Sequence, residues 1–318
     1  MKLLKPERLC LGDTVGLIAP ASPPPDPKAI DRAAEALEEY GFKPKLAKNV
    51  RARHGFLAGS DRERAADFMA MFTDKKVKAV LCLRGGYGCY RILDRLDYEV
   101  LRRHPKIFSG YSDITALHNV LAAKCGMISF HAPMWNGALA DPKVPAFTKK
   151  SFLRTVTEAK APGSICAGYT GKTVSILRGG MAEGRLIGGN LSLLCASLGT
   201  PFAPSFKGKI LFFEDLSERP GRVDRMLTQL WHAGIFSQVA GVAVGVNQDC
   251  DEPGNKKSRE FQQTGADVLR ERLAALRVPV VIGLPFGHVD LNATIPVNAK
   301  ARLDGKRGDL VITEAAVR

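Results

Sequence analysis

The chain has 318 residues, of which 45% are hydrophobic and 25% are charged, and its formal net charge at pH 7 is +14. This length and composition are typical of a globular protein with one large or two ordinary domains, and they exclude a disordered or fibrous chain. The positive charge favours an anionic ligand, but the basic residues are scattered and accompany no zinc-finger or RNP-type signature. A solvated basic surface explains the charge equally well, and the sequence predicts no nucleic-acid partner.

The seven cysteines are far apart, and no two of them form a C-x-x-C pair. Most lie in apolar segments, so we expect reduced core residues rather than disulfides. The N-terminal sequence MKLLKPERLC has no apolar stretch long enough for a signal peptide, and no run of 18 apolar residues occurs anywhere. These features predict a cytoplasmic protein without a membrane partner.

The first half of the chain alternates between apolar strands and helical segments. The run VKAVLCL over 77–83 has the continuous apolar composition of a strand that is covered on both faces. Ser60, followed three residues later by Glu63, predicts a capping box at a helix start. This β-α-β alternation predicts a doubly wound parallel sheet. The expected elements are a strand over 15–20, a helix over 28–40, a strand over 42–46, a helix over 60–72, a strand over 77–83, helices within 90–103, a strand over 106–108, a helix over 114–124, a strand over 127–130 and a helix over 145–159.

A glycine-rich turn, Arg84-Gly85-Gly86-Tyr87-Gly88, follows the strand at 77–83. Its glycines would let main-chain amides approach a ligand closely, as in a phosphate cradle or an oxyanion hole. The turn is not G-x-G-x-x-G and has no P-loop lysine, so it indicates a dinucleotide site only weakly. A turn that simply needs positive φ angles explains the glycines equally well.

The stretch KIFSGYSDITALHNV over 106–120 has the pattern of a strand, a tight turn and a helix. Such a turn can lift a serine clear of the backbone, with the first helical amides beside its oxygen, so Ser112 is the candidate nucleophile. Ile114 stands where the second glycine of G-x-S-x-G would be, and a helix N-cap is the competing interpretation of the serine. Loops at the carboxyl ends of neighbouring parallel strands share one crevice, so we expect this turn to face the glycine-rich turn.

The α/β rhythm stops between residues 160 and 183, where glycine and small residues predominate. This shift predicts an N-terminal domain over 1–160, a linker over 161–183 and a C-terminal domain over 184–318. The elements expected in the second domain are a short helix to 198, a strand over 209–213, a helix over 221–233, a strand over 239–246, a helix over 259–276, a strand over 279–282 and two closing strands within 293–314.

Two carboxylates, Glu214 and Asp215, stand at the mouth of the apolar strand KILFF. Buried carboxylates are costly unless they are paired or catalytic. An ion pair with Arg222 or Arg225 of the next helix is the simpler explanation, and a catalytic role is the alternative.

Of the six histidines, His131 and His288 follow strands and are the candidates for a general base. No cluster of histidine, cysteine and acidic residues has the spacing of metal ligands, so we expect no metal. The set Ser112, Glu214 and His288 would supply a nucleophile, an orienting acid and a base, each at the end of a buried strand. Spacing alone makes this set one possibility among several.

Seven stretches across nearly the whole chain carry a family resemblance. They are GDTVGLIAPAS (12–22), GFLAGSDRERAADF (55–68), LRGGYGCYRILDRLD (83–97), SGYSDITALHNVL (109–121), GRLIGGNLSLLCASLGTP (184–201), ILFFEDLSERPGRVDRML (210–227) and GLPFGHVDLNATIPV (283–297). In the same order, they resemble stretches of the LD-carboxypeptidase family of serine peptidases, which includes the muramoyltetrapeptide carboxypeptidases and their microcin-immunity relatives. The resemblance implies an α/β fold with an N-terminal flavodoxin-like domain, which has a doubly wound parallel sheet, and a C-terminal β/α domain.

The resemblance also implies the roles of individual residues, which we carry over by motif. Ser112 of GYSD is the implied nucleophile, Glu214 of FFED the orienting acid and His288 of GHVD the base. The main-chain amides of Gly86 and Asp113 are the implied oxyanion hole. The implied reaction is attack on the amide bond before a C-terminal D-alanine, through an acyl-enzyme and without a cofactor or metal.

The implied substrate is a murein tetrapeptide with meso-diaminopimelate or lysine before the D-alanine, met in cell-wall recycling, and the implied assembly is a homodimer. We expect Arg84 or a neighbouring cation to contact the terminal carboxylate. The segment HAP at 131–133 departs from the small glycine turn that the family resemblance leads us to expect there. The segment between GGNL and FFED is short, which disfavours the microcin-immunity branch. Two alternatives are a peptidase that cleaves peptide or aminoacyl nucleotides, and a non-catalytic anion-binding protein in which Ser112 only caps a helix.

Overall fold

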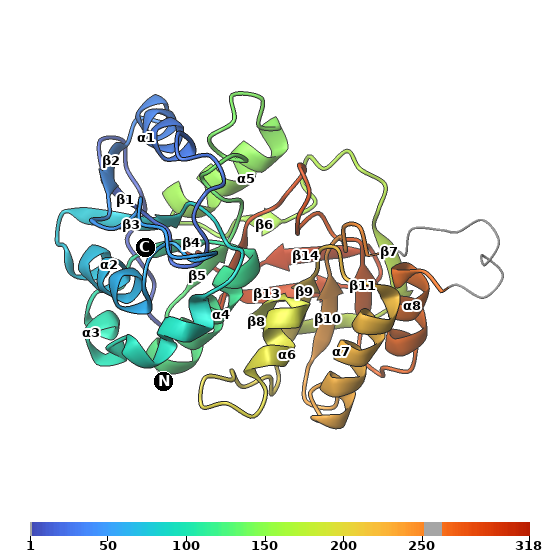
Figure 1. Cartoon of the computed structure of the whole chain (residues 1–318). Coiled ribbons are helices and arrows are strands. Elements are labelled where there is room, and N and C mark those ends of the chain that lie inside the picture. Colours follow the sequence, from blue (N-terminus) through green and yellow to red (C-terminus); the bar gives the residue numbers. More distant parts are fainter. Residues whose placement is uncertain (1, 251–262) are drawn as a thin grey trace, which may run out of the picture.

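The computed structural model describes residues 2–250 and 263–318, which form two α/β domains side by side (Figure 1). The first sheet has the strand order β2-β1-β3-β4-β5-β12, and its first five strands are parallel. The order 2-1-3-4-5 is that of a flavodoxin-like sheet, so the predicted fold class is confirmed. The strands are β1 (Thr14–Ile18), β2 (Lys43–Leu46), β3 (Val77–Cys82), β4 (Ile107–Gly110), β5 (Ser129–His131) and β12 (Ile295–Val297).

The helices of the first domain agree with the periodicity of the sequence. The helix at 61–73 begins with the predicted capping box, in which Ser60 and Glu63 bond each other's main-chain N–H groups. The helices predicted within 90–103 are two, because the first ends with Leu96 as its C-cap and the side chain of Asp97 caps the start of the second. The helices are α1 (Ala29–Glu39), α2 (Asp61–Thr73), η1 (Cys89–Arg95), α3 (Tyr98–Arg103), η2 (Ser112–Ile114), α4 (Thr115–Val120), η3 (Leu121–Cys125) and α5 (Ala146–Thr157).

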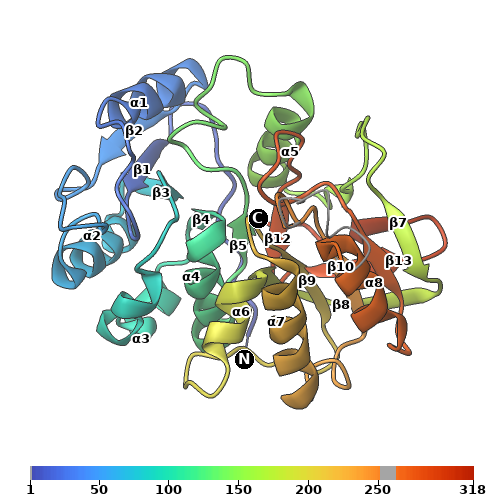
Figure 2. The same ribbon diagram turned by 45° about the vertical axis from the view of Figure 1, so that its right-hand side comes forward.

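The second domain has a mixed sheet with the order β6-β14-β13-β8-β9-β10-β11-β7. Strands β8 to β11 are parallel, and antiparallel strands flank them on both sides. Helix α6 lies between α4 of the first domain and α7 (Figures 1 and 2). The elements are β6 (Gly163–Ser164), β7 (Ser175–Arg178), β8 (Met181–Asn190), α6 (Leu191–Ser197), β9 (Ile210–Glu214), α7 (Pro220–His232), β10 (Gly241–Val244), α8 (Gly265–Ala274), β11 (Val280–Ile282), β13 (Lys300–Asp304) and β14 (Asp309–Ile312).

The prediction of two closing strands within 293–314 is wrong, because this segment forms three. Asn298 adopts a left-handed conformation with φ of 69° between β12 and β13, so the chain turns there. Strand β12 therefore leaves the second domain and pairs antiparallel with β5, placing Ile295 opposite His131. The predicted helix over 259–276 is described only from Gly265, and its part within 259–262 lies outside the described residues.

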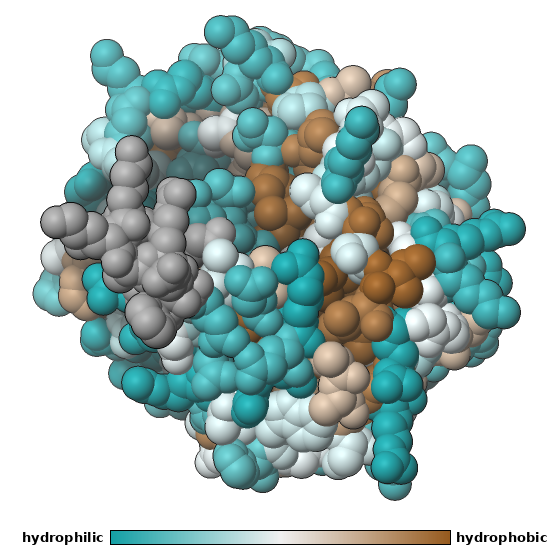
Figure 3. Space-filling model, turned by 90° about the vertical axis from the view of Figure 1, so that its right-hand side faces the viewer, coloured by the Kyte–Doolittle hydropathy of each residue, from teal (hydrophilic) through white to brown (hydrophobic). Residues whose placement is uncertain are grey.

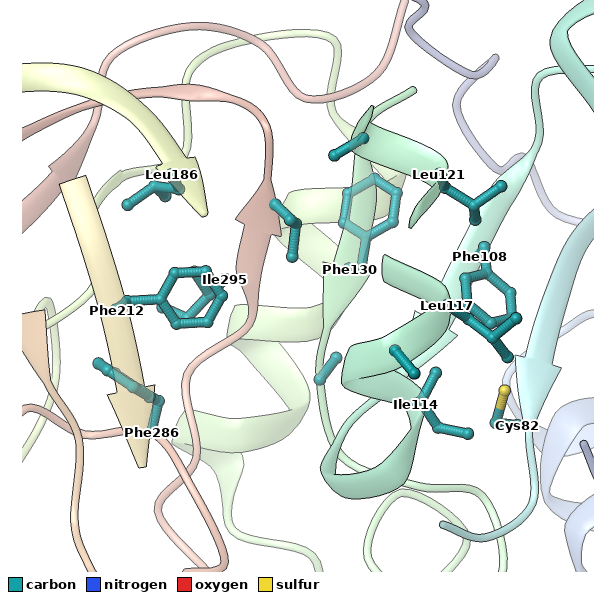
Figure 4. Close-up of a cluster of buried hydrophobic side chains, with 14 of the residues drawn as sticks. Cys82, Phe108, Ile114, Leu117, Leu121, Phe130, Leu186, Phe212, Phe286 and Ile295 are labelled. Atoms are coloured by element: carbon teal, nitrogen blue, oxygen red, sulfur yellow. The ribbon is translucent and has the colours of Figure 1, made fainter. Parts of the chain in front are cut away.

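One apolar core runs through both domains. Figure 4 shows Phe108, Phe130, Phe212, Phe286 and Ile295 within it, all fully buried. Because β12 belongs to the second half of the chain but to the first sheet, its apolar side chains join the two cores. The domain limits 1–160, 161–183 and 184–318 stay a prediction, and within the middle range the strands β6 and β7 belong to the second sheet.

The surface of the second domain that faces away from the first is largely hydrophilic, with an apolar patch among the polar residues (Figure 3). Large hydrophobic residues with exposed side chains include Ile176 of β7 and Met181 of β8. Among the described helices, none combines the length and the apolar character needed to cross a membrane.

Candidate active site

Ser112 lies in a strained turn directly after the central strand β4. Its φ angle is 60°, in the left-handed region that residues other than glycine seldom adopt, at a cost of about 1–3 kcal/mol. The helical segment begins at Ser112 itself, and its N-cap position is occupied by Tyr111 without a side-chain cap. The structure therefore contradicts the capping interpretation of Ser112, and a strained, partly exposed serine is typical of a nucleophile turn.

The glycine-rich turn packs against the serine turn, as expected from the sequence. A Cβ atom on Gly85 would lie 3.0 Å from Cβ of Ser112 and 3.2 Å from the main-chain nitrogen of Asp113. Gly86 has a φ angle of 95°, and a Cβ there would lie 2.5 Å from Oγ of Ser22. Among the described loop, turn and cap hydrogen bonds, none uses the N–H of Gly86 or of Asp113. Both amides are therefore free for a ligand.

A buried arginine holds the glycine-rich turn in place. The guanidinium of Arg64, which is 2% exposed, donates to the carbonyls of Pro20 and Gly88 and to the carboxylate of Asp61. A Cβ on Gly88 would lie 2.8 Å from this guanidinium, so only glycine fits there. Arg64 thereby fixes the end of the turn through charge-assisted hydrogen bonds.

The side chain of Asp113 forms a second tie to the same turn. Its Oδ2 atom accepts a hydrogen bond of 2.8 Å from the N–H of Cys89, immediately after the turn. Burial raises the pKa of this carboxyl group, and the bond from Cys89 opposes that rise. The two turns therefore form one hydrogen-bonded unit.

Glu214 and His288 form a hydrogen-bonded pair in the second domain. Nδ1 of His288 lies 2.7 Å from Oε2 of Glu214, whose side chain is fully buried at the end of β9, while the His288 side chain is 13% exposed. Because the carboxylate oxygen of Glu214 accepts this bond, the neutral imidazole carries its proton on Nδ1 and leaves Nε2 as a free acceptor. A Cβ on Gly287 would lie 3.1 Å from the same Oε2 atom, so glycine is needed where the histidine loop crosses the acid.

The predicted ion pair between these acids and the arginines of the next helix is wrong. Arg222 pairs instead with Glu218. Asp215 accepts hydrogen bonds from the side chain of Asn190 and from the main-chain N–H groups of Ser192 and Leu216. Burial raises the pKa of Asp215 to about 6. The neighbouring carboxylates thus have different roles, because Asp215 orders the start of α6 whereas Glu214 binds the histidine.

The turn between β8 and α6 joins the two domains beside the site. The N–H of Asn190 donates to Oγ1 of Thr115 in α4 over 2.9 Å. A Cβ on Gly189 would lie 2.3 Å from the same oxygen, so this contact requires glycine. The GGN sequence therefore serves a close approach between domains and holds α4, which follows Ser112, against the second domain.

The ring of Tyr111 connects the serine turn to the histidine. Its centroid lies 4.6 Å from that of His288, in a tilted arrangement. Burial, with a contribution from Glu214, raises the pKa of the Tyr111 phenol to about 12, so this ring is neutral near pH 7. Because Tyr111 precedes Ser112, the contact brings the serine turn of the first domain to the histidine loop of the second.

The other candidate base, His131, is fully buried behind the site. Its ring packs against Tyr111 at 5.9 Å and Phe212 at 5.5 Å between centroids, and neither ring nitrogen has a partner among the described residues. Burial lowers its pKa well below the usual value. These surroundings make His131 a core residue rather than a base.

Arg84 lies at the start of the glycine-rich turn, where its guanidinium donates to the carbonyl of Pro23 over 2.7 Å. Sequence patterns did not identify Tyr111, Ser22 or Arg64 as parts of the site. Only Arg64 gives a sequence signal, because it lies four residues before the buried Phe68 on the apolar side of α2.

A strained serine at a strand–helix turn, a glycine-rich turn with free amides and a buried His–Glu pair define the class of two-domain α/β serine peptidases. The chain belongs to the LD-carboxypeptidase family: residues 15–132 match the LD-carboxypeptidase N-terminal domain and residues 183–303 the LD-carboxypeptidase C-terminal domain. It is therefore an enzyme of the serine carboxypeptidase type.

Three known proteins document the similarity over the whole chain. The probable murein peptide carboxypeptidase of Bacillus subtilis is 42% identical over 315 residues, which cover 98% of this chain and 95% of that protein. A crystal structure of muramoyltetrapeptide carboxypeptidase from Oxalobacter formigenes has a TM-score of 0.81 at 32% identity, covering 95% of this chain and 99% of that one. A structure of MccF in complex with glutamyl sulfamoyl guanosine has a TM-score of 0.89 at 26% identity, covering 99% and 100%.

Proposed function

We propose that this enzyme releases the C-terminal D-alanine from murein tetrapeptides, cleaving the bond after meso-diaminopimelate or lysine. Ser112 is the nucleophile, His288 the base and Glu214 the acid that orients it. The observation that carries the proposal is the 2.7 Å hydrogen bond between His288 and Glu214, which keeps the proton on Nδ1 and leaves Nε2 as a base. The names of the Bacillus subtilis and Oxalobacter formigenes relatives support the substrate.

In the proposed reaction, Nε2 of His288 takes the proton of Ser112 as its Oγ attacks the amide carbonyl. The N–H groups of Gly86 and Asp113 bind the oxyanion, and removing one such donor typically costs about 3–4 kcal/mol. The imidazolium then gives its proton to the leaving amine of D-alanine. Water, activated by the same imidazole, hydrolyses the acyl-enzyme. The free amides of the two turns and the bonds that hold these turns together support this assignment.

The test is mass spectrometry of a purified murein tetrapeptide after incubation with the enzyme. We expect the loss of one alanine with the wild type and none with Ser112→Ala, whose melting temperature should stay close to that of the wild type. A fluorophosphonate probe should label the wild type at Ser112. An intact tetrapeptide after prolonged incubation, or turnover by Ser112→Ala, would contradict the proposal.

A second candidate substrate is a peptide or aminoacyl nucleotide. It is favoured by the TM-score of 0.89 to MccF bound to glutamyl sulfamoyl guanosine. The same Ser112 and His288 would attack an amide in either substrate. Side-by-side assays with the tetrapeptide and an aminoacyl sulfamoyl adenylate distinguish the two, because the proposed enzyme should turn over only the tetrapeptide.

The proposed setting is cell-wall recycling in the cytoplasm, with a homodimer as the assembly. Light scattering on the purified protein should give a mass near twice the 34.4 kDa of one chain. Deletion of the gene should cause tetrapeptides to accumulate in a cytoplasmic extract.

A further inference from the structure

A preformed cavity of about 340 Å³ lies beside His288, the proposed general base. Tyr111 and His288 form one side, and Pro133, Asp141 and Lys143 belong to the segment before α5 that forms another. This volume lies in the range of small-molecule sites.

Hydrogen bonds between the two domains fix the walls of this cavity. The hydroxyl of Thr148, at the start of α5, donates to the carbonyl of Asp290 and accepts from the N–H of Asn292 over 2.9 Å. The side chain of Asn292 donates to the carbonyl of Gly287 over 2.7 Å, immediately before His288. The histidine loop therefore has a set position relative to α5, and the cavity needs no ligand to form.

The charged residues of the cavity have opposite signs. Asp141, Asp290 and Lys143 line it, and all three are exposed. Among the described salt bridges, none involves any of these three side chains. The N–H of Lys143 donates to Oδ1 of Asp141 over 2.8 Å, so the cation and this carboxylate project from a single turn. Such a site is complementary to a group that carries both an ammonium and a carboxylate.

The proposed reaction indicates which part of the substrate reaches this cavity. The residue whose carbonyl is attacked at Ser112 has its side chain only a few bonds from the reacting atoms. The side chain of the leaving D-alanine is a single methyl group and would leave most of the volume empty. The arm of the preceding residue is therefore the substrate group that fits a cavity bounded by Tyr111 and His288.

We propose that this cavity binds the side-chain end of the residue before the D-alanine and selects an arm that ends in both an ammonium and a carboxylate. Lys143 binds the carboxylate, and Asp141 and Asp290 bind the ammonium. Because a lysine arm ends in an ammonium alone, Lys143 is the specificity-determining residue and favours the diaminopimelate peptide over the lysine peptide. This inference rests on the proposed function and specifies the substrate of the same site.

The test compares two tetrapeptides that differ only in meso-diaminopimelate or L-lysine at the third position. The measurement is kcat/KM for D-alanine release by the wild type, by Lys143→Met and by the double variant Asp141→Asn/Asp290→Asn. The control is Lys150→Met, because Lys150 is exposed on α5 and does not line this cavity. Lys143→Met should reduce the preference for the diaminopimelate peptide about fivefold, the value of an exposed ion pair of about 1 kcal/mol. The double variant should slow both peptides, and the control should match the wild type.

An equal loss of kcat/KM on both peptides in Lys143→Met would overturn the inference, because Lys143 would then bind a group that both peptides share, such as the terminal carboxylate. An unchanged preference would overturn it as well. If the wild type hydrolyses neither peptide, the proposed function fails, and calorimetric binding of both peptides to Ser112→Ala decides the cavity separately. Weaker binding of the diaminopimelate peptide alone in Ser112→Ala/Lys143→Met would support the inference, and equal binding would refute it.

Discussion

His118 should make the stability of the protein sensitive to mild acid. This histidine is fully buried on α4, where Nε2 lies 2.8 Å from the carbonyl oxygen of Gly110 and Nδ1 lies 2.8 Å from Oγ of Ser129. The carbonyl of Gly110 can only accept, so the neutral ring carries its proton on Nε2 and accepts from the Ser129 hydroxyl at Nδ1. A second proton on Nδ1 would force the Ser129 hydroxyl to turn and accept, and it would place a positive charge in a fully buried site.

The magnitude follows from the pKa of His118, which burial lowers from 6.5 to about 4. At a pH between 4 and 6.5, the His118 ring binds a second proton in the unfolded state but not in the folded state. The contribution to the free energy of unfolding is therefore complete above pH 6.5 and is lost progressively as the pH falls toward 4. The two pKa values differ about 300-fold in proton affinity, which corresponds to about 3 kcal/mol. His131, whose pKa is also lowered by burial, acts in the same direction.

The perturbation is His118→Gln, which keeps an amide donor near Gly110 but cannot titrate. Urea unfolding at pH 8 should show the variant about 1–3 kcal/mol less stable than the wild type, because the buried Ser129 hydroxyl loses its acceptor. Between pH 7 and 4.5 the variant should lose about 2 kcal/mol less than the wild type does. The control His232→Gln, at an exposed helix end, should follow the wild type. Parallel stability curves for His118→Gln and the wild type would refute the reasoning.

Three further predictions concern the site and are measured by steady-state release of D-alanine. Glu214→Gln should lower kcat about 10³- to 10⁴-fold with little change in KM, because an amide cannot hold the Nδ1–H tautomer of His288. Asp215→Asn should instead mainly lower the melting temperature. Equal losses of kcat in the two variants would contradict the separate roles of the two acids. Arg64→Met, assayed well below its melting temperature, should lower kcat about 10²-fold, because the glycine-rich turn and its oxyanion donor would shift. Arg64→Lys should recover part of this loss. A folded Arg64→Met variant with the kcat of the wild type would show that Arg64 does not position the turn. Arg84→Ala should raise KM well above the loss in kcat, and unchanged kinetics would remove Arg84 from substrate binding.

The arrangement of the two domains explains why so many polar groups near the site are structural. The contact between Asn190 and Thr115, and the bonds from Thr148 to the histidine loop, join the first domain to the second on two sides of the site. Because the proposed nucleophile and the His288–Glu214 pair come from different domains, their relative position depends on these contacts. Substitutions there should act on the geometry of the site as well as on stability.

Local patterns in the sequence predicted most of the helices and strands and placed the polar residues at strand ends. Apolar runs such as VKAVLCL and the capping box at Ser60 depend on local patterns, and the structure has the strand and the helix where these patterns predict them. The sequence also predicted that the glycine-rich turn and the serine turn face each other, because loops after neighbouring parallel strands meet at one edge of the sheet.

The partner that each polar group takes depends on the tertiary structure, and beforehand only the family resemblance had implied the pairing of Glu214 with His288. Glu214 and Asp215 are adjacent in sequence, but successive side chains point to opposite faces of a strand, so one binds His288 and the other binds Asn190. The pairing of β12 with β5 likewise joins residues far apart in the chain, and so does the hydrogen bond from Arg64 to the carbonyl of Gly88. Local patterns carry no record of such pairings, because the energy of a hydrogen bond between distant residues depends on packing that neither segment specifies alone.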